Sequence, residues 1–427
     1  MLPRQNKPKQ WSRLDNAAKL FASTVNKADA KVFRFGCELT QEVDPSCLQR
    51  ALDRTVLSFP LYRCVMKKGL FWYYFEECNL RPVIAAETQQ PCSALFDKNE
   101  KGLLFRVSFY KQRINLEVFH ALSDGTGALE FLRLLVYNYL SDKLALEQAP
   151  PLQYDASRSQ RMDDSFAKYY RRQPRARSSH VRAHQLRGPR LAEHRLRILE
   201  GSFSTSAALR LAKEYGATIG VLFTAVLLCS INQELAVRDR RRPVVITVPV
   251  NLRKYFPSAS ARNFFNTIMV PYLFQSPQAP LRTVVASVSE SFRRQLEAEQ
   301  VERRMNAFGA IERNVFARAT PLTLKDVFIR LGDHYANAAC TAAFSNVGKV
   351  EMPDCFAPYI RLFNVCVSTN RLQLCLCSFG DRMTASFTSP LVSTDIQKNF
   401  FRFLTDHGID VELCANPLDE DDAFSAT

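Results

Sequence analysis

A histidine close to an aspartate and two glycines is the first feature of this chain that could do chemistry. The stretch is EVFHALSDGTGALEF, from Glu117 to Phe131. The imidazole of His120 titrates near neutral pH, so it could take up a proton and return it within one reaction. A single histidine is also a common core residue, and Asp124-Gly125 is a dipeptide of ordinary turns. These residues alone therefore leave both catalysis and packing open.

The elements around this stretch fix where the histidine must lie. Apolar residues at Ile114, Leu116 and Val118 alternate with others and lead to His120, which predicts a strand whose apolar face carries the imidazole. From Ala128 to Tyr139 apolar residues recur at helical spacing, which predicts a helix. Its N-cap candidates are Ser123, Asp124 and Thr126. His120 is therefore expected at a strand-to-helix junction, where a rigid support meets an opening.

Length and composition predict a large globular protein. The chain has 427 residues, 47% of them hydrophobic, and this favours two lobes, each with its own core. The basic start lacks an apolar run behind it, so no signal peptide is expected. The uncharged stretch from Tyr215 to Gln233 is interrupted by polar residues and predicts a buried helix rather than a transmembrane segment. The twelve cysteines form no metal-binding pattern and indicate reduced packing residues in a cytoplasmic protein.

The net charge of +15 is concentrated in one segment. Between Ser157 and Arg197 there are twelve Arg or Lys residues against three acidic ones, with prolines and little apolar periodicity. This predicts an exposed basic connector that could meet the phosphates of a cofactor, an anionic membrane surface or RNA, or could simply be solvated. No nucleic-acid motif accompanies it, so nucleic acid is not the expected partner.

The expected fold class is α/β (α+β), with two lobes, each a mixed sheet flanked by helices. The expected order along the chain is a flexible basic tail (1–10), an N-terminal lobe (11–155), the basic connector (156–198), a C-terminal lobe (199–415) and an acidic, disordered tail (416–427). Within this order the patterns predict a strand at 32–39, a helix at 45–57, a hairpin through 67–69, a strand near 196–203, a helix at 204–215 and a strand at 243–252.

The string His120-Ala-Leu-Ser-Asp124-Gly125 resembles the HxxxDG motif of the CoA-dependent acyltransferase superfamily, which includes chloramphenicol acetyltransferase and the condensation domains of peptide synthetases. Further segments follow in the family's order. The run LSFPLYRCVM contains Arg63 where condensation domains have an arginine, RNFFNTIMVPY is similar to their FVNT segment, and FSNVGKV resembles a segment of wax ester synthases. The resemblance covers about 11–413, and the opening WSRLDNAAKLF looks most like the bacterial alcohol acetyltransferase branch.

The resemblance implies a site and a reaction. His120 would act as general base for acyl transfer from acyl-CoA to a hydroxyl acceptor or an amine, in a tunnel between the lobes, with no metal and no permanently bound cofactor. Asp124 would be structural and paired with Arg63, and Gly125 would allow a backbone path closed to other residues. Asn266 and Thr267 are the candidates for hydrogen bonding to the oxyanion. Arginines of the connector, or of the cluster at 238–242, could contact CoA phosphates.

Two other functions are compatible with the same residues. The donor could be a thioester on a carrier protein, as in condensation domains, and the chain would then have to dock that carrier. Alternatively, the chain could be a non-catalytic binding protein that holds an anionic surface through its connector and retains the HxxxDG stretch for folding.

Overall fold

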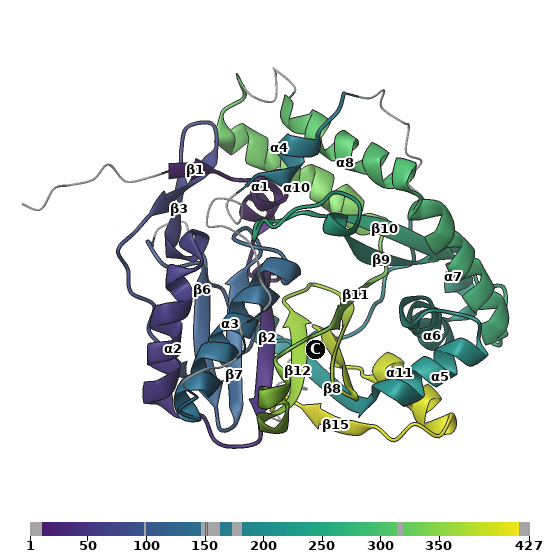
Figure 1. Ribbon diagram of the computed structural model, residues 1–427. Coiled ribbons are helices and arrows are strands. Elements are labelled where there is room, and N and C mark those ends of the chain that lie inside the picture. The colour runs from purple at the N-terminus through teal and green to yellow at the C-terminus, as the bar shows by residue number, and fades with distance from the viewer. Residues whose placement is uncertain are drawn as a thin grey trace, which may run out of the picture.

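The two larger sheets, one in each lobe, lie side by side and carry their helices on different sides (Figure 1). The computed structural model describes residues 11–97, 100–146, 150, 152, 163–172, 182–313 and 319–417. The expected α/β class with two lobes is confirmed, because each lobe combines a mixed sheet with packed helices. The predicted tails, apart from 416–417, and much of the connector lie outside the described residues.

The N-terminal lobe is built on a five-stranded sheet with the order β12-β2-β7-β6-β5. Its strands are β2 (Val32–Leu39), β5 (Ala85–Ala86), β6 (Phe105–Tyr110), β7 (Arg113–Phe119) and β12 (Ile360–Val367). A second sheet has the order β1-β4-β3, from β1 (Trp11–Arg13), β3 (Cys64–Lys68) and β4 (Tyr73–Glu77). The helices of this lobe are α1 (Asn16–Thr24), α2 (Pro45–Leu57) and α3 (Gly125–Lys143), with a short 3-10 turn η1 (Pro60–Arg63).

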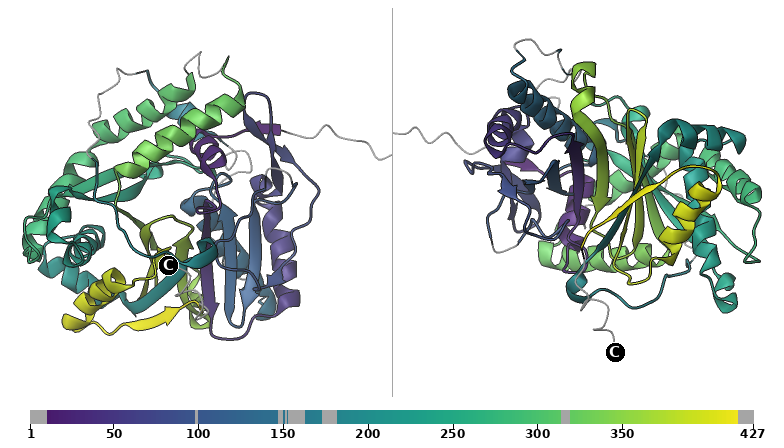
Figure 2. Two further views of the ribbon diagram at one scale, coloured as in Figure 1. Left: turned by 180° about the vertical axis from the view of Figure 1, so that it is seen from behind. Right: turned by 90° about the horizontal axis from the view of Figure 1, so that it is seen from below.

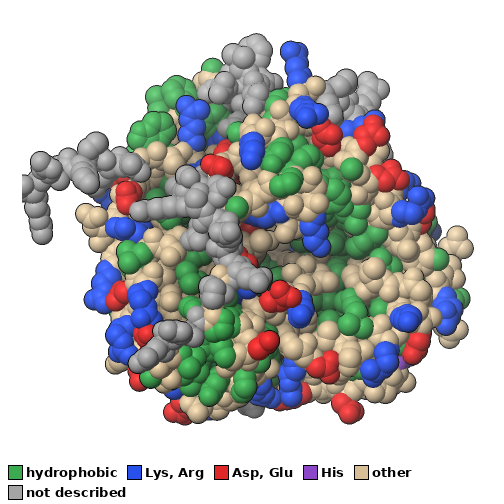
Figure 3. All heavy atoms as spheres, in the orientation of Figure 1, with side chains coloured by type: hydrophobic (Ala, Val, Ile, Leu, Met, Phe, Trp, Pro, Cys, Tyr) green, Lys and Arg blue, Asp and Glu red, His purple; other side chains and the backbone are tan. Residues whose placement is uncertain are grey.

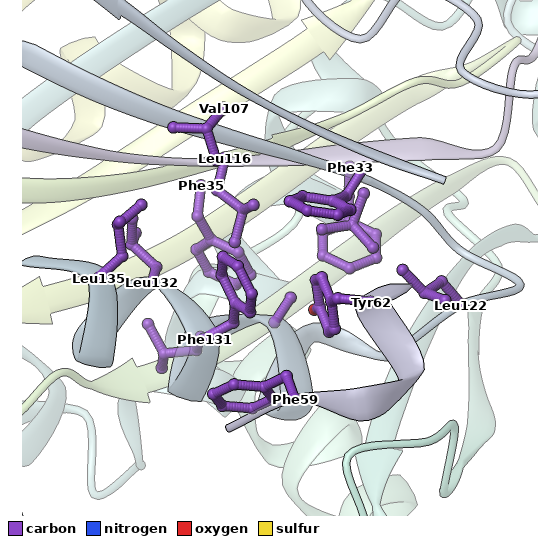
Figure 4. Close-up of a cluster of buried hydrophobic side chains, with 14 of the residues drawn as sticks. Phe33, Phe35, Phe59, Tyr62, Val107, Leu116, Leu122, Phe131, Leu132 and Leu135 are labelled. Carbon is purple, nitrogen blue, oxygen red and sulfur yellow. The ribbon is translucent and has the colours of Figure 1, made fainter. Parts of the chain in front are cut away.

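Aromatic rings fill the space between the five-stranded sheet and its helices (Figure 4). Tyr62 stacks on Phe131 of α3 with ring centroids 4.2 Å apart, and Phe59 and Phe105 meet the same ring from other sides. All four side chains are buried. This packing holds α3, and with it the turn that follows His120, against the sheet.

The C-terminal lobe is built on a seven-stranded sheet with the order β10-β9-β11-β13-β14-β8-β15. Its strands are β8 (Arg197–Ser204), β9 (Val244–Asn251), β10 (Phe265–Tyr272), β11 (Ala342–Lys349), β13 (Leu372–Phe379), β14 (Arg382–Ser389) and β15 (Glu412–Ala415). Helices α5 (Thr205–Glu214), α6 (Ile219–Gln233), α7 (Leu281–Gln295) and α11 (Asp395–Asp406) belong to this lobe. Three more helices lie at the end of the molecule where α1 is found: α4 (Ser165–Tyr169), α8 (Ala298–Arg313) and α10 (Leu322–Ala338) (Figure 1).

Local sequence patterns located several of these elements. The strand at 32–39 and the helix at 45–57 are found with the predicted bounds, and the bounds of the strands and helix predicted between 196 and 252 differ by one residue. The stretch predicted as a buried helix forms α6, most of whose side chains are buried. No single helix in the described ranges is long and apolar enough to span a bilayer, and α5 with α6 reaches that length and composition only across a bend of 79°.

One strand crosses between the lobes. β12 comes from the expected C-terminal lobe, 199–415, but pairs antiparallel with β2 at the edge of the N-terminal sheet. The division by sequence position is therefore wrong for this strand, because a sheet edge can be completed by a segment distant along the chain. Asn364 of β12 also donates a 2.6 Å hydrogen bond to Glu200 of β8, so the strand ties the two sheets together.

The connector is partly packed in the residues that can be described. Phe166 of α4 is buried against Phe264 and Met305, and Ala183 is fully buried with its N–H donating to Ala338 O. The expectation of an exposed connector is therefore wrong for these residues. Each cysteine is unpaired, and Cys375 and Cys377 share one buried face of β13, as their spacing predicted.

Replacing Gly36 with alanine should destabilise the link between the lobes. Gly36 of β2 lies between Asn364 of β12 and Asn115 of β7, and an added Cβ would collide with Asn364 Oδ1 and come within 3.3 Å of Asn115 Oδ1. Such overpacking costs about 1–3 kcal/mol. We expect Gly36→Ala to lower the midpoint of urea unfolding accordingly. Gly102→Ala is the matched control, since a Cβ there meets no atom within 4 Å; equal losses in the two variants would contradict this packing.

Candidate active site

His120 lies at the junction of the two lobes, immediately after β7. Its backbone N–H donates to Lys31 O over 2.7 Å, which fixes the main chain beside the start of β2. Its ring stacks on Phe21 of α1 with centroids 4.1 Å apart and meets the edge of Phe33 of β2 at 4.9 Å. Phe265 of β10, in the other lobe, lies 5.6 Å away. The imidazole is thus on the apolar face that the strand pattern predicted, in an aromatic surround.

This surround keeps the imidazole neutral. Burial lowers the pKa of His120 below its ordinary value, and the charge of Lys31 acts in the same direction. Hydrogen bonding of the ring and the negative charge of Asp124 oppose the shift without cancelling it. A histidine with a lowered pKa carries a free lone pair at neutral pH, which a general base requires.

Asn263 holds one nitrogen of this ring. The distance between His120 Nδ1 and Asn263 Oδ1 is 3.3 Å. With the amide oxygen as acceptor, Nδ1 carries the hydrogen and Nε2 retains the lone pair. The amide nitrogen of Asn263 donates to Asp15 Oδ2 over 3.4 Å and to Ala121 O over 3.5 Å. Asn263 is therefore a site residue that the sequence prediction missed, because nothing in RNFFNT distinguishes it from its neighbours.

Asp15 stands behind Asn263. Its Oδ1 accepts from Ala18 N over 2.8 Å and caps α1, the helix that carries Phe21. Burial raises its pKa to about 6, against the opposing effects of the bond from Ala18 and the charge of Arg262. One carboxylate therefore supports two contacts of His120: the hydrogen bond of Asn263 and the stacked ring of Phe21.

Asp124 pairs with Arg253, and the prediction of Arg63 as its partner is wrong. Asp124 Oδ2 accepts from Arg253 Nη1 over 2.7 Å and from Phe264 N over 2.8 Å. Its Oδ1 accepts from Gly127 N over 3.0 Å, so Asp124 is also the N-cap of α3. No ion pair or hydrogen bond between Arg63 and Asp124 occurs among the described residues. The carboxylate faces the C-terminal lobe, whereas Arg63 ends η1 of its own lobe.

Arg253 holds the loop that leads into β10. It lies in the short turn η5 (Leu252–Lys254), and its Nη2 donates to Ser260 O over 2.8 Å and to Arg262 O over 2.7 Å. The loop that it fixes contains Asn263. In a chain with 57 Lys and Arg residues, no sequence signal separates this arginine from the others.

Gly127, rather than Gly125, is the glycine that the site requires. A Cβ on Gly125 would meet only the Phe35 ring, 3.9 Å away, so the predicted need for glycine there is wrong. A Cβ on Gly127 would collide with Ala261 O and Ser123 Oγ. The loop of the C-terminal lobe crosses the start of α3 at this point, and Ser123 Oγ donates to Ala261 O over 2.6 Å.

The two oxyanion candidates differ in where they face. Phe265, Asn266 and Thr267 begin β10, and side chains of a strand point alternately to its two faces. Thr267 therefore shares the face of Phe265, which contacts His120, whereas Asn266 lies on the opposite face and accepts from Thr267 N over 2.7 Å. The Thr267 side chain is exposed. The structure thus separates a pair that the sequence had left equal.

Open space is found between the lobes and also at the end of β2 that is distant from His120. A recess between the lobes has hydrophobic side chains at its floor (Figure 3). A cavity of about 1550 Å³, lined by Ile360 and Arg361 among others, lies instead by the Leu39 end of β2, and His120 is anchored at the Val32 end. Val32 and Leu39 are seven residues apart along the strand, a distance of about 23 Å, so this cavity does not surround the imidazole. Of the 238–242 cluster, Arg240 is engaged by Asn232 and Leu235 O.

The ion pair predicts a pattern of stabilities. Asp124→Ala would leave the Arg253 guanidinium buried without its carboxylate, at a cost of about 3–5 kcal/mol. Arg253→Ala should cost a similar amount, and the two losses should be far from additive in the double variant. Arg63→Ala is the control and should cost under about 1 kcal/mol. Urea unfolding of the four variants measures this, and a coupling of Asp124 to Arg63 instead would contradict the observed pairing.

Searches with the sequence find no matching family model and no similar curated protein. Comparison of the structure with solved structures finds many of the same shape. The trichothecene 15-O-acetyltransferase TRI3 from Fusarium sporotrichioides is 12% identical with a TM-score of 0.61, covering 93% of this chain and 94% of that one. TRI101 from F. sporotrichioides, solved with coenzyme A and T-2, is 12% identical with a TM-score of 0.62, covering 94% and 99%.

Condensation domains have the same arrangement. The first condensation domain of the calcium-dependent antibiotic synthetase, solved with a substrate analogue, is 14% identical with a TM-score of 0.59, covering 93% of this chain and 96% of that one. At such identities the comparison establishes the fold. Along nearly all of its length, this chain has the two-lobed, chloramphenicol-acetyltransferase-like fold that these acetyltransferases and condensation domains share.

Proposed function

We propose that this chain is an acyltransferase that moves an acyl group from acyl-CoA to a hydroxyl acceptor, with His120 as general base. The observation that carries the proposal is the held, neutral imidazole at the lobe junction. Its Nδ1 lies 3.3 Å from Asn263 Oδ1, which leaves the Nε2 lone pair for a substrate.

The reaction follows from that nitrogen. Nε2 takes the proton of the acceptor hydroxyl as its oxygen attacks the thioester carbonyl carbon, forming a C–O bond and a tetrahedral oxyanion. The oxyanion then collapses, the C–S bond breaks, and the imidazolium returns its proton to the thiolate. The products are an ester and free CoA. An amine acceptor would follow the same steps to an amide.

The oxyanion needs a hydrogen-bond donor at the moment it forms. We assign this role to the Thr267 hydroxyl in preference to Asn266, because Thr267 shares the strand face of Phe265 beside His120. Asp124 contributes no atom to the reaction in this proposal. It positions the turn after His120 through Arg253 and Phe264 N.

Two acyl donors are compatible with the proposal, free acyl-CoA and a thioester on a carrier protein. Coenzyme A is bound in TRI101, and the opening WSRLDNAAKLF resembles bacterial alcohol acetyltransferases, which favours free acyl-CoA. The similarity to a condensation domain favours a thioester on a carrier protein as the second candidate. The chemistry at His120 is the same for both donors.

Replacing His120 should abolish acyl transfer. We expect His120→Ala to lower kcat/KM by about 10²–10⁴-fold, the usual contribution of a general base. The measurement is acceptor-dependent release of thiol from a panel of acyl-CoAs with alcohols and amines, repeated with acyl-carrier thioesters. Lys27→Ala is a control at an exposed position of the same lobe. Turnover that survives His120→Ala in a folded protein would refute the proposed base.

The pH dependence should show a base with a lowered pKa. Activity is lost as pH falls through the pKa of the folded enzyme, so the midpoint of the acidic limb of kcat/KM should lie below the ordinary histidine value of about 6.5. Asn263→Ala should move this limb to lower pH and reduce kcat, since the hydrogen bond that His120 Nδ1 donates to Asn263 Oδ1 raises the pKa of His120. Asp15 titrates at about 6 in the same range. Asp15→Asn, which retains the cap of α1, should keep the limb; its disappearance would assign the limb to Asp15.

A further inference from the structure

Helix α10 has its polar face inward and its apolar face outward. Its buried residues are Leu322, Lys325 and Asp326. Five apolar side chains at helical spacing are instead between 51% and 74% exposed: Leu324, Val327, Phe328, Leu331 and Tyr335. A surface helix of a globular protein normally shows the reverse arrangement. In the view from behind, α10 crosses the outside of the molecule (Figure 2).

Polar bonds fix this orientation. The carboxylate of Asp326 accepts from Ser23 Oγ of α1 over 2.7 Å and from the Tyr73 hydroxyl of β4 over 3.1 Å. Arg330 Nε donates to Ser23 O over 3.0 Å. Rotating α10 about its axis would break these three bonds and take the Asp326 acceptor away from the Ser23 and Tyr73 hydroxyls.

The hairpin between β3 and β4 extends the same surface. Leu70 and Phe71 at its tip are 74% and 40% exposed. Leu70 O accepts from Leu322 N over 2.9 Å, and Phe71 O accepts from Lys325 Nζ over 3.0 Å, so the tip adjoins the start of α10. We call these seven side chains the α10 patch: Leu70, Phe71, Leu324, Val327, Phe328, Leu331 and Tyr335. Neighbouring large apolar side chains exposed on one surface mark interaction sites.

Positive charge surrounds the patch. Lys68 precedes the hairpin tip and is exposed, and Arg330 is exposed between the apolar positions of α10. Lys19, partly exposed, lies over the Trp72 ring with its nitrogen 4.9 Å from the centroid, whereas Lys325 is buried and donates to Phe71 O, so it is not part of the rim. This basic rim favours an anionic partner and disfavours a second copy of the chain, whose own rim would repel it.

The acidic groups of α10 leave the rim basic. Asp326 is buried and held by Ser23 and Tyr73. Asp333 is partly buried and accepts from Asn337 over 2.8 Å. The chain as a whole carries a net charge of +15.

We propose that the α10 patch docks this protein on the surface of an anionic phospholipid bilayer. Leucine and aromatic side chains would enter the boundary between headgroups and acyl chains, while the lysines and arginines would meet the phosphates. Docking goes beyond acyl transfer, yet it bears on the site. α1 packs on α10 and carries Phe21, which stacks on His120, so the bilayer would lie one helix away from the imidazole.

Vesicle flotation of the full chain tests the proposal. The probes are vesicles of equal parts phosphatidylcholine and phosphatidylserine, and vesicles of phosphatidylcholine alone. Phe328→Ser with Leu331→Ser removes two patch side chains that are 68% and 52% exposed. The matched control is Leu209→Ser with Val237→Ser, since these apolar residues on α5 and on the short turn η4 (Val237–Arg241) are also exposed, at 53% and 83%. Thermal unfolding should confirm that both double variants remain folded.

We expect the protein to float with phosphatidylserine vesicles, with a partition coefficient at least about tenfold lower in the patch variant and within about twofold of wild type in the control. Binding should weaken with salt. The proposal is overturned if neither vesicle carries the protein, if both variants lose binding equally, or if the patch variant instead converts a dimer to a monomer. Thiol release with water-soluble substrates should be unchanged in the patch variant, so this readout separates a failure of docking from a failure of acyl transfer.

Discussion

The arrangement of the site depends on one buried carboxylate at the boundary of the lobes. Asp124 is 4% exposed and accepts three hydrogen bonds: from Gly127 N in α3, from Arg253, and from Phe264 N before β10. A carboxylate this deep is tolerated only when each of its oxygens is bonded. Two of the donors belong to the C-terminal lobe, so the lobes must close on each other for Asp124 to be buried at all. Closure of the two lobes and burial of the Asp124 charge therefore occur together.

The ion pair of Asp124 and Arg253 also fixes the positions of His120 and of its hydrogen-bond partner. Arg253 donates to Asp124 and also to Ser260 O and Arg262 O, and so it fixes the conformation of the loop in which Asn263 lies. Asn263 in turn holds Nδ1 of the imidazole. The positions of the histidine and of its hydrogen-bond partner are therefore both fixed by Asp124, one through α3 and one through Arg253. A positioned, neutral imidazole results without any charged group in direct contact with the ring.

The sequence located what is local and missed what is distant. The bounds of β2 and α2 follow from alternation, from helical spacing, and from Asp44 and Pro45 at the start of α2, all of which act within a few residues. His120 could be placed on its apolar face for the same reason. Arg253, Asn263 and Gly127 could not be found, because each matters through a contact with a segment more than 100 residues away. The pairing of β12 with β2 spans more than 300 residues and has no local signal at all.

The same distinction applies to the orientation of α10. Its apolar spacing is that of a helix with an ordinary buried stripe, and only the tertiary contacts of Asp326 reveal that the stripe faces outward. Because Ser23 and Phe21 lie on the same short helix, α1 joins this outward-facing element to the aromatic surround of His120. A partner bound to the outer face of α10 would contact the helix on which α1 packs. α1 is also capped by Asp15, which accepts a hydrogen bond from Asn263. The surface and the site therefore share one supporting helix, α1.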